Sequence, residues 1–129
     1  MILVDTNIFI EYYKNNPEIC KQLEHIDPKE IRINDIVCAE LYFGARNKQE
    51  LSNIVADMEK LTDLPITPSI SKLAVDLVKQ YCLSHKLKLP DAQIAATAIL
   101  HNVELFTLNK KDFVYIPTLR LYEPKYVSL

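Results

Sequence analysis

Short apolar runs alternate with segments of helical periodicity along this chain. The apolar runs at residues 2–4, 31–33 and 104–107 have the length and composition of buried strands, and shorter candidates lie at 65–66 and 119–122. Between them, apolar positions three and four apart predict helices at residues 8–13, 19–26, 35–46, 51–61, 70–83 and 90–100. A turn or short helix is expected at residues 109–113.

Alternating strands and helices favour an α/β fold. Right-handed crossovers between short apolar strands give a mainly parallel sheet of four to five strands, covered by helices on both faces. We therefore predict a three-layer α/β/α sandwich. In such sheets, functional sites collect beyond the carboxyl ends of the strands, where Asp5 and the loop at residues 107–112 are expected to lie.

Local signals mark several helix starts. Asn34 or Asp35 is suited to cap the helix at residues 35–46, and Thr67 before Pro68 is a typical capping pair for the helix at residues 70–83. The single glycine, Gly44, and the lack of a Gly/Ser-rich or Pro-rich linker predict one domain over residues 1–129.

Composition narrows the class of protein. The chain has 129 residues, 49% hydrophobic, which suffices for one packed core, and no apolar stretch approaches the roughly 20 residues of a membrane span. No basic segment precedes the short apolar run at the N-terminus, as a signal peptide requires. Cys20, Cys38 and Cys82 are odd in number and widely spaced, which favours buried free thiols in a reducing compartment. We expect a cytoplasmic protein.

Acidic and amide side chains occur where apolar neighbours dominate. Asp5 follows the first strand, Glu40 lies in an apolar helical stripe, Asp91 opens an alanine-rich helix, and Asn109 and Asp112 follow the last core strand. If the fold brings them together, their oxygens suit a hard divalent cation. Two carboxylates about 4 Å apart repel by roughly 4 kcal/mol at an effective dielectric near 20, so a cluster needs a cation or shared protons.

Each position also has a purely structural interpretation. Asp5 can cap the following helix, but Thr6 and Asn7 can do so too, and three successive capping residues favour a functional loop. Asp91 after Pro90 suits a helix start, yet its spacing places it on the apolar face of that helix.

Glu40 is the acidic residue that a capping role explains least, because it lies within an apolar helical stripe. Its helix face is shared with Ile36, Val37, Phe43 and Gly44. We therefore expect this carboxylate to point at the interior or into a cleft, where it needs a cation, a proton or several donors. A salt bridge to a buried Arg or Lys is the alternative. Asn109 and Asp112 alone are typical of a polar surface turn.

Four sequence blocks occur in a fixed order along nearly the whole chain. They are MILVDTN at residues 1–7, AELYFGA at 39–45, LPDAQIAATA at 89–98 and FTLNKKDF at 106–113. The last block is followed by Ile116, Pro117, Leu119 and Leu121. Together these blocks resemble the PIN-domain family. Within that family the chain resembles the VapC-type toxins of bacterial and archaeal toxin–antitoxin pairs.

The resemblance implies a metal-dependent endoribonuclease with a PIN-like fold. By this resemblance, the metal-binding acidic residues of the family correspond to Asp5, Glu40 and Asp91. The implied cofactor is Mg²⁺, with Mn²⁺ as a substitute. The family has a fourth acidic position after the last core strand, and both Asn109 and Asp112 are candidates for that catalytic residue. Of the two, Asp112 is the carboxylate that could bind a second metal ion. The reaction implied is hydrolysis that leaves a 5′-phosphate and a 3′-hydroxyl.

The resemblance also implies protein partners. Such toxins are held inactive by a small antitoxin and usually form homodimers. The helices at residues 19–26 and 51–61 are candidates for the antitoxin groove, and tyrosine-rich surfaces for the dimer contact. A basic rim that guides RNA is expected from six residues, Arg46, Lys48, Lys86, Lys88, Lys110 and Lys111, although each also fits an ordinary solvated surface.

The net charge of −2 and two rival functions qualify this assignment. An acidic balance disfavours a protein that coats nucleic acid through phosphate contacts, but bound cations reverse that argument for a nuclease. A receiver-like or haloacid-dehalogenase-like phosphotransfer domain also places an Asp after its first strand, although Asp5-Thr6-Asn7 lacks the Asp-x-Asp form. The third possibility is a catalytically inactive PIN-like binding module, against which the intact acidic residues argue.

Overall fold

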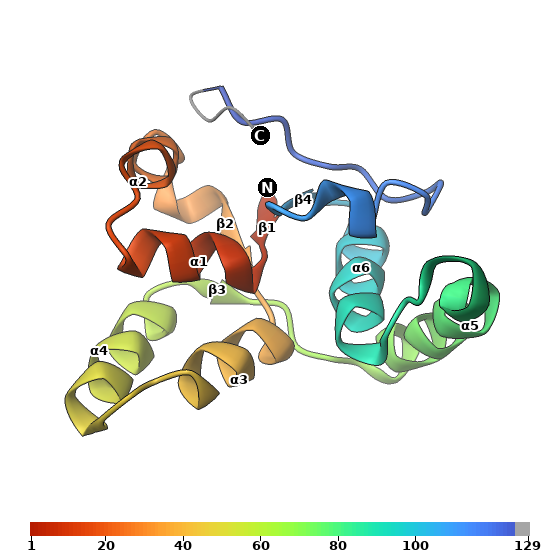
Figure 1. The fold of residues 1–129 in the computed structure, drawn as a ribbon, viewed down its shortest axis with the longest axis horizontal. Coiled ribbons are helices and arrows are strands. Elements are labelled where there is room, and N and C mark those ends of the chain that lie inside the picture. The colour runs from red at the N-terminus through yellow and green to blue at the C-terminus, as the bar shows by residue number, and fades with distance from the viewer. Residues whose placement is uncertain (126–129) are drawn as a thin grey trace.

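A parallel sheet of four short strands lies between the helices (Figure 1). In the computed structural model, which describes residues 1–125, the strands are β1 (Ile2–Val4), β2 (Ile31–Ile33), β3 (Thr62–Asp63) and β4 (Glu104–Phe106). Their order is β3-β2-β1-β4, and every pairing is parallel. The first strand is therefore central, with β2 and β4 on its two sides.

Helices connect the strands on both faces of the sheet. They are α1 (Thr6–Tyr13), α2 (Pro17–Glu24), α3 (Asp35–Phe43), α4 (Lys48–Glu59), α5 (Pro68–His85) and α6 (Leu89–His101), with 3-10 turns η1 (Pro28–Glu30) and η2 (Lys110–Asp112). From β1 to β2 and on to β3, each strand is added on the same side of the one before it. The chain then crosses back over the sheet to place β4 on the other side of β1. Right-handed crossovers therefore put α1–α4 on one face and α5 and α6 on the other, as Figure 1 shows. The predicted three-layer α/β/α sandwich is confirmed.

Several element boundaries differ from those that the sequence predicts. The third strand lies at Thr62–Asp63 instead of residues 65–66, because Pro65 has no N–H to donate to the ladder. The third helix ends at Phe43 instead of residue 46, with Gly44 as its C-cap. The fourth helix starts earlier than predicted, at Lys48, because the Asn47 side chain accepts from the Glu50 N–H and caps it.

The predicted last strand is reduced to a single bridge. Leu121 pairs in parallel with Leu105 of β4, and the Leu105 N–H donates to the Arg120 carbonyl at 2.9 Å. The buried side chain of Gln22 on α2 holds this C-terminal segment, because its Oε1 accepts from the Lys125 N–H at 2.9 Å. The outer edge of β4 is thereby covered.

Two side chains fix how α3 and α6 meet. Asn34, fully buried, caps α3 by accepting from the Val37 N–H at 3.0 Å, and its Nδ2 donates to the Thr97 hydroxyl of α6 at 3.2 Å. The predicted choice between Asn34 and Asp35 is thus decided for Asn34. Thr67 caps α5 as predicted. The alanines of α6 at positions 92, 95, 96 and 98 are fully buried, which confirms tight packing of this helix.

The cysteines are partly as the composition predicts. Cys20, Cys38 and Cys82 are all free thiols, although each is half-buried and not fully buried as predicted. In the part of the chain that the structure describes, no helix has the length and apolar character that crossing a membrane requires.

Candidate active site

Asp5 lies at the carboxyl end of β1, where the sheet reverses its strand order. Strands β1 and β4 are neighbours although they are first and last in sequence, and the Asp5 N–H donates to the Phe106 carbonyl at 2.9 Å. This reversal is the switch point at which parallel sheets usually bind ligands. The Asp5 side chain is only 5% exposed, so its surroundings are set by protein atoms.

The two oxygens of Asp5 have separate roles. One caps α1 by accepting from the Thr6 N–H at 2.7 Å, so the structural interpretation of this residue is correct. The other accepts from the Thr107 hydroxyl at 2.8 Å and from Asn7 Nδ2 at 3.4 Å. Capping and a position at the strand-end site are therefore combined in one side chain.

Asn7 and Thr107 tie the loop after β4 to the start of α1. Asn7 Nδ2 donates to the Thr107 hydroxyl at 3.2 Å, and Asn7 Oδ1 accepts from the Leu108 N–H at 3.1 Å. The Asn109 N–H also donates to the Thr107 hydroxyl, at 3.1 Å. This network holds the Asp5 carboxylate in one orientation.

Burial makes the Asp5 carboxyl a weak acid. The pKa of this carboxyl is raised from 3.8 to about 6, chiefly by removal from water and to a smaller extent by the negative charges of Asp91 and Glu40, while the hydrogen bonds from Thr107 and Thr6 act against the rise. Asp91 and Glu40 are therefore close enough to Asp5 to interact with it electrostatically.

Glu40 has one of the two environments predicted for it, a cleft and not the interior. It is exposed, as is Phe43 at 93%, while Val37 and Leu41 form the buried stripe of α3. The expectation that Glu40 points at the interior is wrong, because the buried stripe of α3 lies one position away, but the alternative of a cleft is confirmed, since Glu40 lines a cavity between α1, α3 and α4. No ion pair to Glu40 is seen within residues 1–125, so the alternative of a buried salt bridge is also not found. Instead its carboxylate accepts from the Thr6 hydroxyl at 2.8 Å.

Asp91 faces the same acidic region from α6. It lies in the first turn of the helix and is half-buried, next to buried Ala92, Ile94 and Ala95, which agrees with its predicted position on the apolar face. Burial raises its pKa, and the charges of Glu40 and Asp112 add to that effect, while Lys88 opposes it. Asp91 is thus influenced by acidic groups from α3 and from η2.

The two residues proposed for the fourth position are placed differently. Both Asn109 and Asp112 are exposed, but only Asp112 acts electrostatically on Asp91. The backbone of Asn109 instead belongs to the network around Thr107. The structure therefore groups Asp112 with the other carboxylates.

The carboxylates share one edge of the sheet without meeting at one point. In the described range, no three His, Cys, Asp or Glu side chains are arranged as a metal-binding group. Their donor chemistry nevertheless suits Mg²⁺ or Mn²⁺, because it consists of carboxylate oxygens without thiolate or imidazole. Mutual repulsion among Asp5, Glu40 and Asp91 is the condition that a bound cation would relieve.

Sequence reasoning missed the roles of two positioning residues. It treated Thr6 and Asn7 only as alternative caps, whereas Thr6 holds Glu40 and Asn7 joins the two loops. The run of three polar residues after an apolar strand was the available signal, but their partners lie 34 to 101 residues away in sequence.

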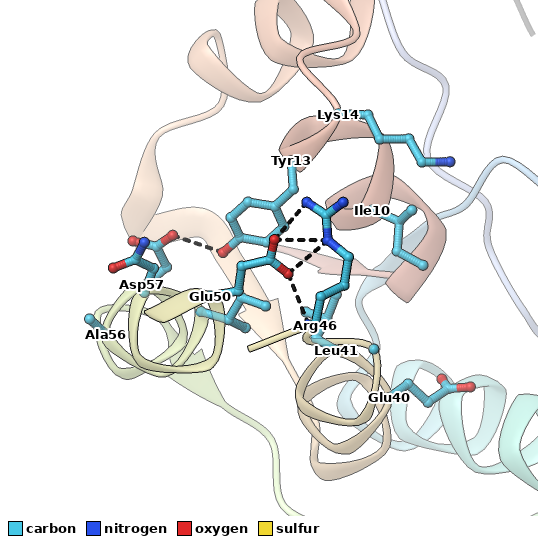
Figure 2. A pocket seen from close by; sticks show the side chains of 12 residues that line it. Ile10, Tyr13, Lys14, Glu40, Leu41, Arg46, Glu50, Ala56 and Asp57 are labelled. Atoms are coloured by element: carbon cyan, nitrogen blue, oxygen red, sulfur yellow. Dashed lines mark hydrogen bonds and ion pairs between the residues drawn. The ribbon is translucent and has the colours of Figure 1, made fainter. Parts of the chain in front are cut away.

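A cavity of about 770 Å³ adjoins the acidic edge (Figure 2). It lies between α1, α3 and α4 and is lined by Ile10, Tyr13, Lys14, Glu40, Leu41, Gly44, Arg46, Glu50, Asn53, Ile54, Ala56 and Asp57. On its wall the Tyr13 hydroxyl donates to Asp57 at 2.8 Å, and Arg46 pairs with Glu50 at 2.6 Å. Figure 2 shows Glu40 pointing away from this ion pair, at one end of the cavity.

Two residues of the predicted basic rim form ion pairs with acidic side chains. Arg46 is bound to Glu50 and Lys110 to Glu123, the latter at 2.7 Å. Lys86 and Lys88 lie exposed on the link between α5 and α6, and Lys111 is exposed on η2.

Comparison with known proteins places this geometry in a family. The PIN domain profile matches residues 2–118. The chain is 34% identical over 116 residues to Ribonuclease VapC1 of Methanocaldococcus jannaschii, covering 87% of this chain and 78% of that protein. It is 29% identical over 123 residues to Ribonuclease VapC19 of Mycobacterium tuberculosis, covering 93% and 98%.

A solved structure agrees with these relatives. A toxin–antitoxin complex from Klebsiella pneumoniae matches with a TM-score of 0.80 and 35% identity, over 95% of this chain and 99% of that chain. The chain therefore belongs to the PIN-domain family and, within it, to the VapC-type toxin ribonucleases of toxin–antitoxin pairs.

Proposed function

We propose that this protein is a Mg²⁺-dependent endoribonuclease whose metal site is built on Asp5, with Mn²⁺ able to replace Mg²⁺. The observation that carries the proposal is the buried Asp5 carboxylate at the switch point, hydrogen-bonded to Thr107 and reached by the charges of Glu40 and Asp91. The relatives named as ribonucleases support RNA as the substrate.

Each acidic side chain has a proposed role. Asp5 is the fixed metal ligand, Asp91 and Glu40 complete the site from α6 and α3, and Asp112 is the carboxylate for a second ion, with Asn109 beside it. When bound, the cation would polarise the scissile phosphate and lower the pKa of a water molecule. The chain itself supplies orientation, because Thr107, Asn7 and Thr6 hold two of these carboxylates in place.

The phosphotransfer alternative receives no support from the lysine it needs. A receiver-like domain needs a lysine after a late strand, and Lys110, which follows β4, pairs with Glu123 at 2.7 Å. Phosphorylation of Asp5 by a small phosphodonor would be the sign of such a domain, and we expect none.

We further propose that an antitoxin segment occupies the cavity between α1, α3 and α4. The cavity combines an apolar wall with Glu40 at its acidic end, so a helix with an apolar face and a basic side chain would fit it. Of the two segments that the sequence favours for this groove, residues 51–61 contribute to the lining and residues 19–26 do not. A cytoplasmic site of action is part of the same proposal and agrees with the free cysteines.

A homodimer is also proposed. The proposal rests on the family resemblance, and Phe43 and Leu83, which are 93% and 95% exposed, are the large apolar side chains that would gain most from burial in such a contact. Sedimentation at several concentrations should give a dimer that Phe43→Ser or Leu83→Ser weakens. A monomer at all concentrations would contradict this part of the proposal.

Metal-dependent cleavage tests the central proposal. Purified protein is incubated with a panel of single-stranded and structured RNAs with Mg²⁺, with Mn²⁺ and with chelator, beside Asp5→Ala. We expect cleavage that requires the metal and is lost in the variant. Cleavage that survives in Asp5→Ala, or that is equal in chelator, would overturn the proposal.

A further inference from the structure

We propose that His85, Tyr115 and Tyr81 form a platform on which an unpaired base of single-stranded RNA stacks beside the scissile phosphate. The inference rests on the proposed ribonuclease function and adds to it a site for substrate recognition. It is drawn from the ring geometry, from the position of the rings next to the acidic side chains and from the exposed lysines around them.

The three rings form one ordered cluster. His85 and Tyr115 are stacked, with ring centroids 3.8 Å apart and planes inclined by 13°. Tyr81 meets Tyr115 edge-on at 5.0 Å and His85 at 5.9 Å. The His85 ring is held further by the Ser84 hydroxyl, 2.8 Å from its Nδ1. Because the stack exists before any ligand binds, little side-chain freedom is lost when a base joins it.

The cluster joins the two segments that carry Asp91 and Asp112. Tyr81 and His85 lie on the last turns of α5, and the short link that follows leads into the first turn of α6, which contains Asp91. Tyr115 follows η2, which ends at Asp112. After burial, the charges of Asp91 and Asp112 are the main causes that raise the pKa of Tyr115, so this phenol lies within reach of both carboxylates.

The rings are open to solvent and near positive charge. His85 is exposed, while Tyr81 and Tyr115 are half-buried. The link beside His85 carries Lys86 and Lys88, both exposed, and neither forms an ion pair within residues 1–125. These ammonium groups can contact the phosphates on either side of a stacked base.

A role in packing alone accounts for Tyr81 better than for His85. The helical spacing of Tyr81 favours packing, and this ring is half-buried against the core. An exposed imidazole that lies parallel to a phenol adds little to a core. Stacking of unpaired bases on aromatic rings is instead the usual way in which proteins hold single-stranded RNA, and it tolerates different bases.

A fluorescent base provides a direct test. Short single-stranded oligoribonucleotides carry 2-aminopurine at one position at a time, and binding to the metal-free protein is followed through quenching of that base. We expect strong quenching at one position near the cleavage site. His85→Ala should abolish this quenching and weaken binding about tenfold, since one stacked base contributes on this scale.

The matched control is His101→Ala. His101 is also exposed and lies at the opposite end of α6 from Asp91, so its substitution should change neither quenching nor affinity. Tyr115→Phe should keep both, and Tyr115→Leu should lose both while the protein stays folded by circular dichroism. Unchanged quenching and affinity in His85→Ala and Tyr115→Leu would overturn the platform and leave the rings as packing of the loop.

The two proposals can fail separately. If the wild-type protein cleaves RNA with Mg²⁺ but His85→Ala binds like wild type, the platform is wrong and the nuclease stands. If quenching depends on His85 while no RNA is cleaved under any metal condition, the platform stands and the nuclease proposal is wrong.

Discussion

Asp5 and Asp91 carry the same functional group in contrasting surroundings. Asp5 is 5% exposed and accepts hydrogen bonds from the Thr6 N–H, the Thr107 hydroxyl and Asn7. Asp91 is half-buried, and its carboxylate accepts no hydrogen bond from residues in the described range. One carboxylate is held by donors from α1 and from the loop after β4, and the other is held by no hydrogen bond among the described residues.

This contrast indicates how the site can be stable without metal and still offer carboxylate ligands to the proposed cation. A rigid cluster of ionised carboxylates would repel strongly in the folded protein. With Asp5 fixed and Asp91, Glu40 and Asp112 more exposed, only one buried charge carries a large cost without metal.

Removing either charge should abolish cleavage, but only one removal should strongly stabilise the metal-free fold. We expect Asp5→Asn and Asp91→Asn each to lower RNA cleavage by more than about 100-fold, since even outer-shell partners of a metal are worth 10–100-fold. Unfolding by urea without metal at pH 7 should show a larger gain in stability for Asp5→Asn. Equal gains would contradict the contrast between the two carboxylates.

The stability of the metal-free protein should fall as pH rises. The folded-state pKa of Asp5 is about 6 against 3.8, so the folded protein binds the proton more tightly. The associated stabilisation is complete below pH 4 and is lost as pH rises through 6, a change of about 3 kcal/mol.

The measurement for this pH prediction is urea unfolding from pH 4 to 7 for the wild type and Asp5→Asn. The difference between the two proteins should show the fall, because all other groups are shared. Saturating Mg²⁺ should reduce it, since the cation favours the ionised form. A difference that does not vary with pH would contradict the burial cost assigned to Asp5.

Two buried threonines offer a matched pair. Thr107→Val removes the hydroxyl that donates to Asp5 and accepts from Asn7, and Thr97→Val removes the hydroxyl that accepts from Asn34. Each should destabilise the fold by about 1–3 kcal/mol, because buried polar partners are left unsatisfied.

Only Thr107→Val should act on the chemistry of the site. We expect about 10–100-fold weaker cleavage and a higher pKa for Asp5, since the bond from Thr107 lowers that pKa. Thr97→Val should cleave normally below its unfolding temperature. Equal losses of activity in the two variants would show that Thr107 acts only through stability.

The smallest effect on stability is expected at Glu40. Glu40→Gln keeps an oxygen that can accept from the Thr6 hydroxyl, and the side chain is exposed, so stability should change by less than about 0.5 kcal/mol. Cleavage should still fall about tenfold if the charge contributes to metal binding. A melting curve and a cleavage assay with added Mg²⁺ would check both values.

The sequence predicted the layers of the fold but not the pairing details. Hydrophobic periodicity located the helices because their faces pack on the sheet. It misplaced β3, since a strand of two residues, Thr62–Asp63, has no periodicity to detect. It also extended α3 beyond Phe43, because Ala45 and Arg46 are good helix formers and the structure ends the helix at Gly44.

The site was predictable in part for similar reasons. Asp5 and the loop at residues 107–112 could be assigned to the same edge, because the carboxyl ends of parallel strands meet there. The exposure of Glu40 could not, since a shift of one position on α3 decides which side faces the core. The partners of Thr6 and Asn7 depend on tertiary contacts that local sequence does not encode.

The bond between Asp5 and Thr107 closes a loop of 102 residues. The first half of the chain contains α1–α4 but lacks Thr107, so it has no such partner to orient that aspartate. Contacts so distant in sequence are usually among the slowest to form. Nascent or truncated forms that lack β4 should therefore not cleave RNA. Toxicity should arise only after β4 and the loop that follows it have joined the folded protein.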